Sequence, residues 1–435
     1  TLPGKPDQMS PIRAAVPSNF STSGLDVDPR GESRHMEDLL AEIRGIDGFT
    51  SFGLPRTFSQ ITALAEEATV VYLNAAILRC DALLVTTAGV TVVPLNVTAA
   101  EVAARAVEFW DAINGSIASS NMEEVIHSEA RARGVAAWLW DSIAAPVLNH
   151  LEFPPQDEAT ASTLWPRIWW IPTGHLAVLP MQIAGHHSTY GTQTADTSLT
   201  VIDRVVSTQL PSIETLAAAQ RVPDDQADNI SCLMVATSHP EGESALNGVS
   251  KEVNLLVARL GRDRMWLLAD EPTLIPDGPS TKPAVLNALP TNNWAHFACH
   301  AKATPQAPTE SQLILSDHRT DPFRVEDLLS VRPAAPRLAF FSACSTAQIS
   351  PNLAHEPVHF GIAASLAGYA HSVLTLWPVR DDPEIADLIY EGVLGSTTWP
   401  MDAATAASVH DANRRMRLRS ANALHRWAAT IHQGP

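Results

Sequence analysis

The stretches WAHFACH (294–300) and RLAFFSAC (337–344) decide the fold of this chain, because each combines a buried-strand pattern with a reactive last residue. Both are short, nearly continuous apolar runs, which is typical of strands covered on both faces in a parallel sheet. The first ends in His300 and the second in Cys344. Because sites in such sheets form beyond the carboxyl ends of the strands, we expect both side chains at one edge of a sheet.

Strand and helix patterns alternate around these two stretches. Further strands are expected at TVVYLNA, DALLVT, VTVVPL, RIWWIP, ISCLMVAT, RMWLLAD, SQLILSD and HSVLTLWPV. Helical patterns lie at 99–113, 122–151 (bent near Pro146), 249–260 and 358–370. This alternation predicts an α/β fold with a mainly parallel sheet.

The composition excludes several classes of protein. With 45% hydrophobic and 17% charged residues among 435, the chain is too apolar to be disordered, yet no run reaches the ~18 apolar residues of a membrane span. Its net charge of −18 argues against nucleic acid or an anionic membrane as partner. The one basic cluster, 414–419, is most simply the solvated face of a late helix. Four widely spaced cysteines without a CxxC pair indicate a reducing, cytoplasmic setting.

A cysteine beside a histidine can ionise as a thiolate–imidazolium pair, in which the thiolate is the nucleophile. His300 precedes Cys344 by 44 residues, which is the order of caspases rather than of papain-like enzymes. Cys299 is a poor partner for His300, because alternation along a strand points the two side chains to opposite faces. On spacing alone, two packed core residues remain the simpler interpretation.

A metal site is the other chemistry that this region suggests. His296 and His300 are four residues apart, as in helical zinc motifs. No glutamate follows the first histidine, however, and the segment is predicted to be a strand. We therefore expect neither a metal nor another cofactor.

Taken together, the motifs resemble the CHAT domain, a family of caspase-like cysteine peptidases related to separase, in the form often seen in fungal proteins. The resemblance covers roughly 65–435 and is carried by HFACH, SQLILSD, LAFFSACSTA and HSVLTLWPVRDD in that order. It implies a caspase-like three-layer α/β sandwich. A linker and short helical lead-in (1–64) would precede a non-catalytic half (65–222) and a catalytic half (223–435).

The resemblance also assigns roles to residues. It makes His300 the general base and Cys344 the nucleophile, with the backbone N–H groups of Ala301 and Cys344 binding the oxyanion. The family favours Gly where this chain has Ala301, and alanine is costly if a positive φ is required there. Trp377, Asp381 and Asp317 are candidates for the substrate pocket, although turn capping is the simpler role for Asp317. If Asp381 lines that pocket, a basic residue should precede the scissile bond.

Two other functions remain open at this point. A scaffold or signalling module would keep the fold without the chemistry, and a thiol amidase would act on small molecules. Members of the family often carry helical repeats before the domain. Because this chain begins with Thr1, we expect it to be a fragment whose regulatory partner acts through missing upstream repeats. The sequence identifies neither the substrate, nor the activating event, nor the oligomeric state.

Overall fold

The computed structural model describes residues 29–50, 52–156, 165–187, 199–222, 229–304, 306–355, 358–396 and 401–435. The chain forms two compact units, residues 1–57 and 58–435. The described part of the first is mainly helix α1 (Pro29–Arg44), which is amphipathic. All the sheets belong to the second unit.

The first sheet of this unit has five strands in the order β3-β2-β1-β4-β5. Its strands are β1 (Thr69–Ala75), β2 (Cys80–Thr86), β3 (Gly89–Leu95), β4 (Arg167–Pro172) and β5 (Val206–Gln209). Strands β1, β4 and β5 are parallel, whereas β2 and β3 form antiparallel hairpin pairs. One face packs on α3 (Ala99–Ala118) and α4 (Met122–Leu139), and the other on α6 (Ile213–Ala219), next to α2 (Phe58–Ala63).

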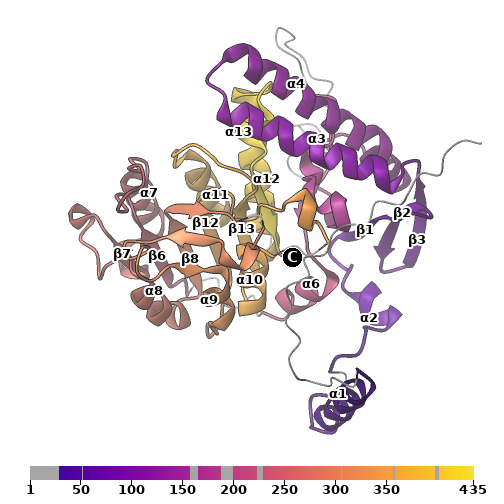
Figure 1. Cartoon of the computed structure of the whole chain (residues 1–435), viewed down its shortest axis with the longest axis horizontal. Helices are drawn as coiled ribbons and strands as arrows, with labels where there is room; N and C mark the ends of the chain where they lie inside the picture. Colours follow the sequence, from indigo (N-terminus) through magenta and orange to yellow (C-terminus); the bar gives the residue numbers. More distant parts are fainter. Residues whose placement is uncertain are drawn as a thin grey trace, which may run out of the picture. The chain divides into compact units, whose positions relative to one another are not determined.

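The second sheet has six strands in the order β7-β6-β8-β12-β13-β14. Its strands are β6 (Cys232–Ala236), β7 (Met265–Ala269), β8 (Trp294–Ala298), β12 (Leu338–Ser342), β13 (His371–Thr375) and β14 (Thr430–Gln433). All are parallel except β14. Helices cover both faces (Figure 1): α7 (Val249–Leu260), α11 (Glu384–Gly395) and α12 (Met401–Arg419) on one, and α8 (Lys282–Ala288), α9 (Val325–Ser330) and α10 (Phe360–Ala367) on the other.

A small antiparallel sheet interrupts the second half. It contains β9 (His300–Lys302), β10 (Gln312–Ile314) and β11 (Phe323–Arg324). The remaining described helices, α5 (Ala145–His150) and α13 (Leu424–Trp427), bury side chains in the same hydrophobic cluster as α3 and α4. Strands β1–β5 precede residue 222 and β6–β14 follow residue 229, and for this reason we propose to divide the chain into halves at 222 and 223.

The helix expected over 122–151 is interrupted before its proline. Helix α4 ends at Leu139, a π-helical turn spans Trp140–Ala144, and α5 follows. Pro146 has no N–H to donate to the preceding turn, so the regular α-helical ladder cannot continue through it. The N–H of Ala145 donates to the carbonyl of Trp140 instead, which is the wider bonding pattern of a π-bulge.

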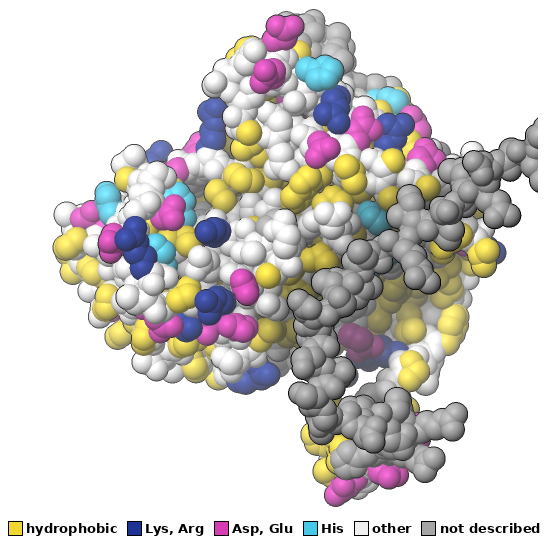
Figure 2. Space-filling model, viewed as in Figure 1, with side chains coloured by type: hydrophobic (Ala, Val, Ile, Leu, Met, Phe, Trp, Pro, Cys, Tyr) yellow, Lys and Arg dark blue, Asp and Glu magenta, His cyan; other side chains and the backbone are white. Residues whose placement is uncertain are grey.

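The expectation that residues 414–419 form a solvated basic face is wrong for Arg417, which is buried. Arg417 is only 8% exposed, and its guanidinium donates two hydrogen bonds to the buried carboxylate of Asp203, at 2.8 and 2.5 Å. Arg415 and Arg419 do lie at the surface. Figure 2 shows Lys and Arg side chains scattered among acidic ones on the face in view. Among the described residues, no helix is both long and apolar enough to cross a membrane.

A buried histidine makes the stability of the fold depend on pH. His359 is 5% exposed at the start of α10, and its Nδ1 accepts the N–H of Gly361 at 3.1 Å. Burial lowers the pKa of His359 to about 4, against an ordinary value of 6.5. In the unfolded chain the imidazole of His359 therefore binds a proton as the pH falls below about 6.5, whereas in the folded chain it stays neutral until about pH 4. The resulting stability is complete above pH 6.5 and is lost as the pH falls from 6.5 towards 4.

We expect the wild-type protein to lose about 2 kcal/mol more stability than His359→Asn between pH 7.5 and pH 5. Asparagine keeps an acceptor for the helix N-terminus but does not titrate. Urea unfolding of both proteins at the two pH values measures the difference. Equal pH dependence of the two would contradict the buried, neutral state of His359.

Candidate active site

The two reactive residues leave the sheet at the same edge. Strands β8 and β12 are parallel neighbours, and Ser342 at the end of β12 pairs with Ala298 at the end of β8. Neighbouring strands lie about 4.8 Å apart. His300 and Cys344 each follow two residues later, beyond the carboxyl ends of these strands. The register therefore brings a histidine and a cysteine to equivalent positions at the usual location of a site in this kind of sheet.

The side chains within β8 anchor this strand in the core. Phe297 and Cys299 belong to one hydrophobic cluster, and burial raises the pKa of the Cys299 thiol. On the opposite face, His296 is fully buried, with Nε2 2.9 Å from Glu252 Oε1 and Nδ1 3.1 Å from the Tyr390 hydroxyl. Both ring nitrogens of His296 are therefore used in these buried hydrogen bonds, and His296 does not share a site with His300.

A backbone carbonyl orients His300. The strand breaks after Ala298, and His300 begins β9, where it pairs with Ile314 of β10. Its Nε2 lies 2.9 Å from the carbonyl oxygen of Ser244 and 3.4 Å from the hydroxyl of the same residue. A carbonyl oxygen only accepts, so Nε2 carries the proton and donates it. In the neutral ring this leaves the lone pair on Nδ1, ready to accept a proton from another group.

Cys344 lies in a tight turn and is protonated at rest. Its thiol is partly buried and donates to the carbonyl of Val379 at 3.7 Å. Burial raises the pKa of Cys344, and the carboxylate of Asp381 raises it further. The next residue, Ser345, has φ +57°, a left-handed conformation that is costly for a residue with a Cβ. None of the hydrogen bonds found among the described residues joins Cys344 to His300, so the dyad is not closed in this state.

The comparisons with known proteins identify the family. A family model described as the CHAT domain matches residues 133–435, which is more than half of the chain. The chain belongs to the CHAT domain family. Of the curated proteins, none matches this chain.

A solved structure supports the same fold for this CHAT protein. The chain is similar to a chain of the Saccharomyces cerevisiae separase–securin complex, with a TM-score of 0.57 and 10% sequence identity. The similarity covers 92% of this CHAT protein but only 33% of the other chain, so the CHAT protein spans about a third of its length. The expected caspase-like α/β sandwich is confirmed as a fold.

Asp381, one of the three candidates for the substrate pocket, contacts the segment before α7. Asp381 is exposed and follows β13, and its Oδ2 accepts the N–H of Gly248 at 2.6 Å. A Cβ at position 248 would collide with this carboxylate, so glycine is required there. The negative charge of Asp381 adds to burial in raising the pKa of Cys344.

The other two pocket candidates make internal contacts. Trp377 is 4% exposed, donates from Nε1 to the carbonyl of His425 at 2.8 Å, and packs edge-on against Phe109 of α3. It also lines a small hollow beside the segment 347–349, which follows the nucleophile. The carboxylate of Asp317 accepts the backbone N–H of Lys282 at the start of α8. The carboxylate of Asp317 is therefore occupied by the first turn of α8.

Ala301 does not carry the strain that its replacement of glycine suggested. It lies in the β9–β10 ladder opposite Leu313, and its φ is not positive. The positive φ of this region falls at Ser345 instead. Alanine at position 301 therefore causes no backbone strain. The N–H groups of Ala301 and Cys344 remain our candidate oxyanion donors.

The sequence does not predict the role of Ser244, because the group that contacts His300 is a backbone carbonyl, which every residue has. The segment that carries it, SALNG (244–248), precedes α7 and lies 52 residues or more before the histidine. Only the fold brings this segment to His300.

Proposed function

We propose that this CHAT protein is a cysteine endopeptidase that hydrolyses protein or peptide substrates through His300 and Cys344. One observation carries the proposal: both residues follow paired ends of adjacent parallel strands, and the carbonyl of Ser244 holds the proton on Nε2 of His300. The ring therefore presents Nδ1 as a base. The four cysteines are free, which suits a reducing compartment, and we propose the cytoplasm.

The reaction then proceeds in two halves. Nδ1 of His300 takes the proton of the Cys344 thiol, and the thiolate attacks the scissile carbonyl carbon. The N–H groups of Ala301 and Cys344 stabilise the oxyanion. The C–N bond breaks, the leaving amine takes the proton from His300, and a thioester remains. Water, deprotonated by His300, hydrolyses the thioester and releases the thiol.

The contacts of Cys344 without substrate are those of an inactive, protonated thiol. Burial and the charge of Asp381 raise the pKa of Cys344, so the thiol that contacts the carbonyl of Val379 is protonated at neutral pH. Catalytic hydrogen bonds are often long or absent without substrate and tighten in the complex. We therefore propose that the Cys344 side chain turns from Val379 towards Nδ1 of His300 in a minor population of the free protein, and that substrate binding makes this orientation the dominant one.

We also propose that Asp381 selects the residue before the scissile bond, with Trp377 as a wall of the same pocket. The carboxylate is exposed and close enough to Cys344 to raise its pKa. An exposed carboxylate beside the nucleophile attracts a positively charged side chain and repels an acidic one.

A peptide-library cleavage profile tests this specificity. We expect cleavage after Arg or Lys by the wild-type protein and none by Cys344→Ala, which reports contaminating proteases. In Asp381→Asn we expect the preference for a basic residue over a neutral one to fall by about tenfold or more, because the charge attraction is gone. A wild-type preference for acidic residues would contradict the role of Asp381.

A further inference from the structure

A loop between β6 and α7 contacts both His300 and Asp381. This loop, which we call the strap, spans Ser238–Gly248 between β6 and α7. Its base is closed by the N–H of Leu246, which donates to the carbonyl of Ser238 at 2.8 Å. The N–H groups of Ser238 and His239 both donate to the carboxylate of Asp270, at 2.8 and 2.7 Å. The strap is thereby fixed at its two ends.

The C-terminal part of the strap contacts His300 and Asp381. The Ser244 carbonyl accepts the Nε2 proton of His300, and the N–H of Gly248 donates to Asp381. A displacement of the strap would move the carbonyl away from the ring. His300 would then lose the contact that decides which nitrogen carries the proton.

Arg319 contacts the strap at Glu241 and Gly242. Arg319 donates from Nη1 to the carboxylate of Glu241 at 2.9 Å and from Nε to the carbonyl of the same residue at 3.1 Å. Its guanidinium lies against Gly242, where a Cβ would collide with it and where φ is +83°. The two bonds and the close contact fix the strap at its tip, a few residues from Ser244.

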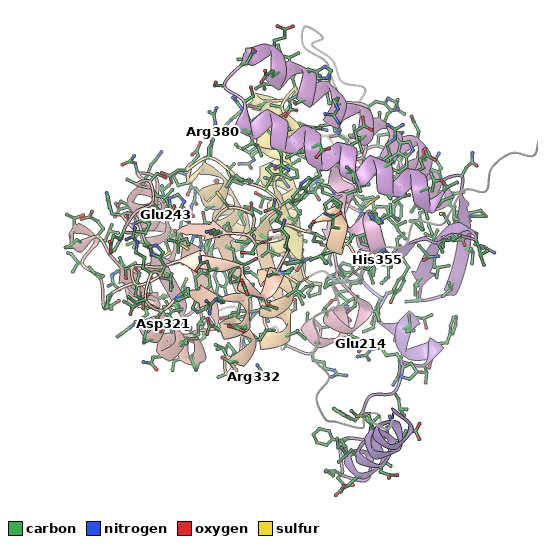
Figure 3. All side chains as sticks on the ribbon, viewed as in Figure 1. Glu214, Glu243, Asp321, Arg332, His355 and Arg380 are labelled. Carbon is green, nitrogen blue, oxygen red and sulfur yellow. The ribbon has the colours of Figure 1, made fainter. Side chains whose placement is uncertain are left out.

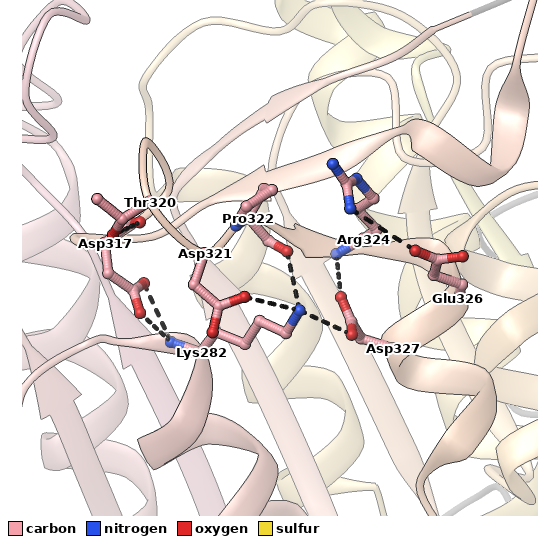
Figure 4. Close-up of polar contacts among 8 residues, drawn as sticks. All are labelled: Lys282, Asp317, Thr320, Asp321, Pro322, Arg324, Glu326 and Asp327. Carbon is pink, nitrogen blue, oxygen red and sulfur yellow. Dashed lines mark hydrogen bonds and ion pairs between the residues drawn. The ribbon is translucent and has the colours of Figure 1, made fainter.

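The loop that carries this arginine is itself rigidly built (Figure 4). The carboxylate of Asp317 accepts the backbone N–H of Lys282, and its carbonyl accepts the N–H of Asp321 at 3.0 Å. The Lys282 ammonium contacts Asp321 at 3.0 Å, Asp327 at 2.9 Å and the carbonyl of Pro322 at 3.2 Å. The loop also follows β10, the strand paired with His300. It therefore gives Arg319 a fixed base close to the histidine.

We propose that Arg319 is a positioning residue for His300, acting through Glu241 and the strap on the carbonyl of Ser244. This inference rests on the proposed function, because it concerns the base of the proposed dyad. The Arg319–Glu241 pair is 56% and 76% exposed at its side chains. Exposed pairs contribute little to stability, so the effect of Arg319 on the active site can be separated from any effect on folding.

The test combines the tautomer of His300 with the reactivity of Cys344. In protein with ¹⁵N-labelled histidine, we assign the ring signals of His300 by their loss in His300→Gln. We expect the Nε2–H tautomer in the wild type and a mixture of tautomers in Arg319→Ala. Alkylation of Cys344 by iodoacetamide at neutral pH, followed by mass spectrometry, should slow by about tenfold in Arg319→Ala, because a misplaced base ionises the thiol less often.

Two variants control this experiment. Arg319→Lys keeps a cation near the Glu241 carboxylate and should recover most of the alkylation rate. Arg332→Ala removes another arginine, shown in Figure 3 well apart from Glu243 of the strap, and should match the wild type. The urea midpoint of Arg319→Ala should also match. An unchanged tautomer in Arg319→Ala overturns the inference, whether or not the rate or the midpoint falls.

Different results would contradict the proposed dyad and the positioning role of Arg319. If Cys344 of the wild type reacts no faster than Cys344 of His300→Ala, the proposed dyad is wrong. The tautomer of His300 in Arg319→Ala is measured without any activity, and it still decides whether the strap positions the ring.

Discussion

We expect peptide hydrolysis to fall by a factor of about 10⁴ or more when Cys344 is replaced by Ala, because no nucleophile remains to form the thioester. The same loss is expected for His300→Ala, since Cys344 is a protonated thiol at rest and needs a base to become nucleophilic. The measurement is kcat/KM on the best peptide from the library. The double variant should be no worse than either single one, because the two residues act as one unit.

Cys299→Ala is the matched control for this loss. Cys299 is adjacent in sequence to His300 but is buried in the core, and burial raises its pKa. Its replacement should leave kcat/KM within about threefold of the wild type, because its buried thiol stays protonated and alanine keeps the position apolar. Hydrolysis that survives in Cys344→Ala, or that disappears in Cys299→Ala alone, would show that the nucleophile has been misassigned.

The largest effect on stability is expected at Asp203. This residue is 1% exposed, and its carboxylate accepts hydrogen bonds from Arg417 and from the Thr200 hydroxyl, with Arg414 at 3.7 Å. Asp203→Ala leaves the charge of Arg417 buried without its partner. We expect a loss of about 3–5 kcal/mol in the free energy of unfolding, measured in urea.

A second ion pair of the same helix provides the comparison. Asp411 lies 2.8 Å from Arg415 on α12, and both side chains are about half exposed. Asp411→Ala should cost no more than about 0.5 kcal/mol. The double variant Asp203→Ala/Arg417→Met should be more stable than Asp203→Ala alone, because it removes the unpaired charge. Similar losses at Asp203 and Asp411 would contradict the burial of the first pair.

The sequence predicts the strands well where burial alone decides them. β1, β4, β8 and β12 fall inside the expected apolar runs, because strands covered on both faces must be apolar throughout. The ends of β8 and β12 are less well predicted, since both stop two residues before the reactive side chain. His300 belongs to the small sheet, so its direction follows from pairing with β10 and not from alternation along β8.

The parts of the site that the sequence does not predict depend on contacts between distant segments. The Ser244 carbonyl reaches His300 across 56 residues, and Arg319 reaches Glu241 across 78. Arg417 looks solvent-exposed beside other arginines, yet its partner Asp203 lies 214 residues earlier. Residue types show that such groups could pair, but only the folded chain decides which of them do.

The position of β14 has a consequence for the timing of synthesis. Strand β13 lies between β12 and β14, and its last residue, Thr375, binds the segment that follows the nucleophile. β14 begins 86 residues after Cys344. At about 5–20 residues per second, a ribosome needs roughly 4–17 seconds to travel this distance. A nascent chain therefore carries both His300 and Cys344 for several seconds before the strand that completes their sheet exists.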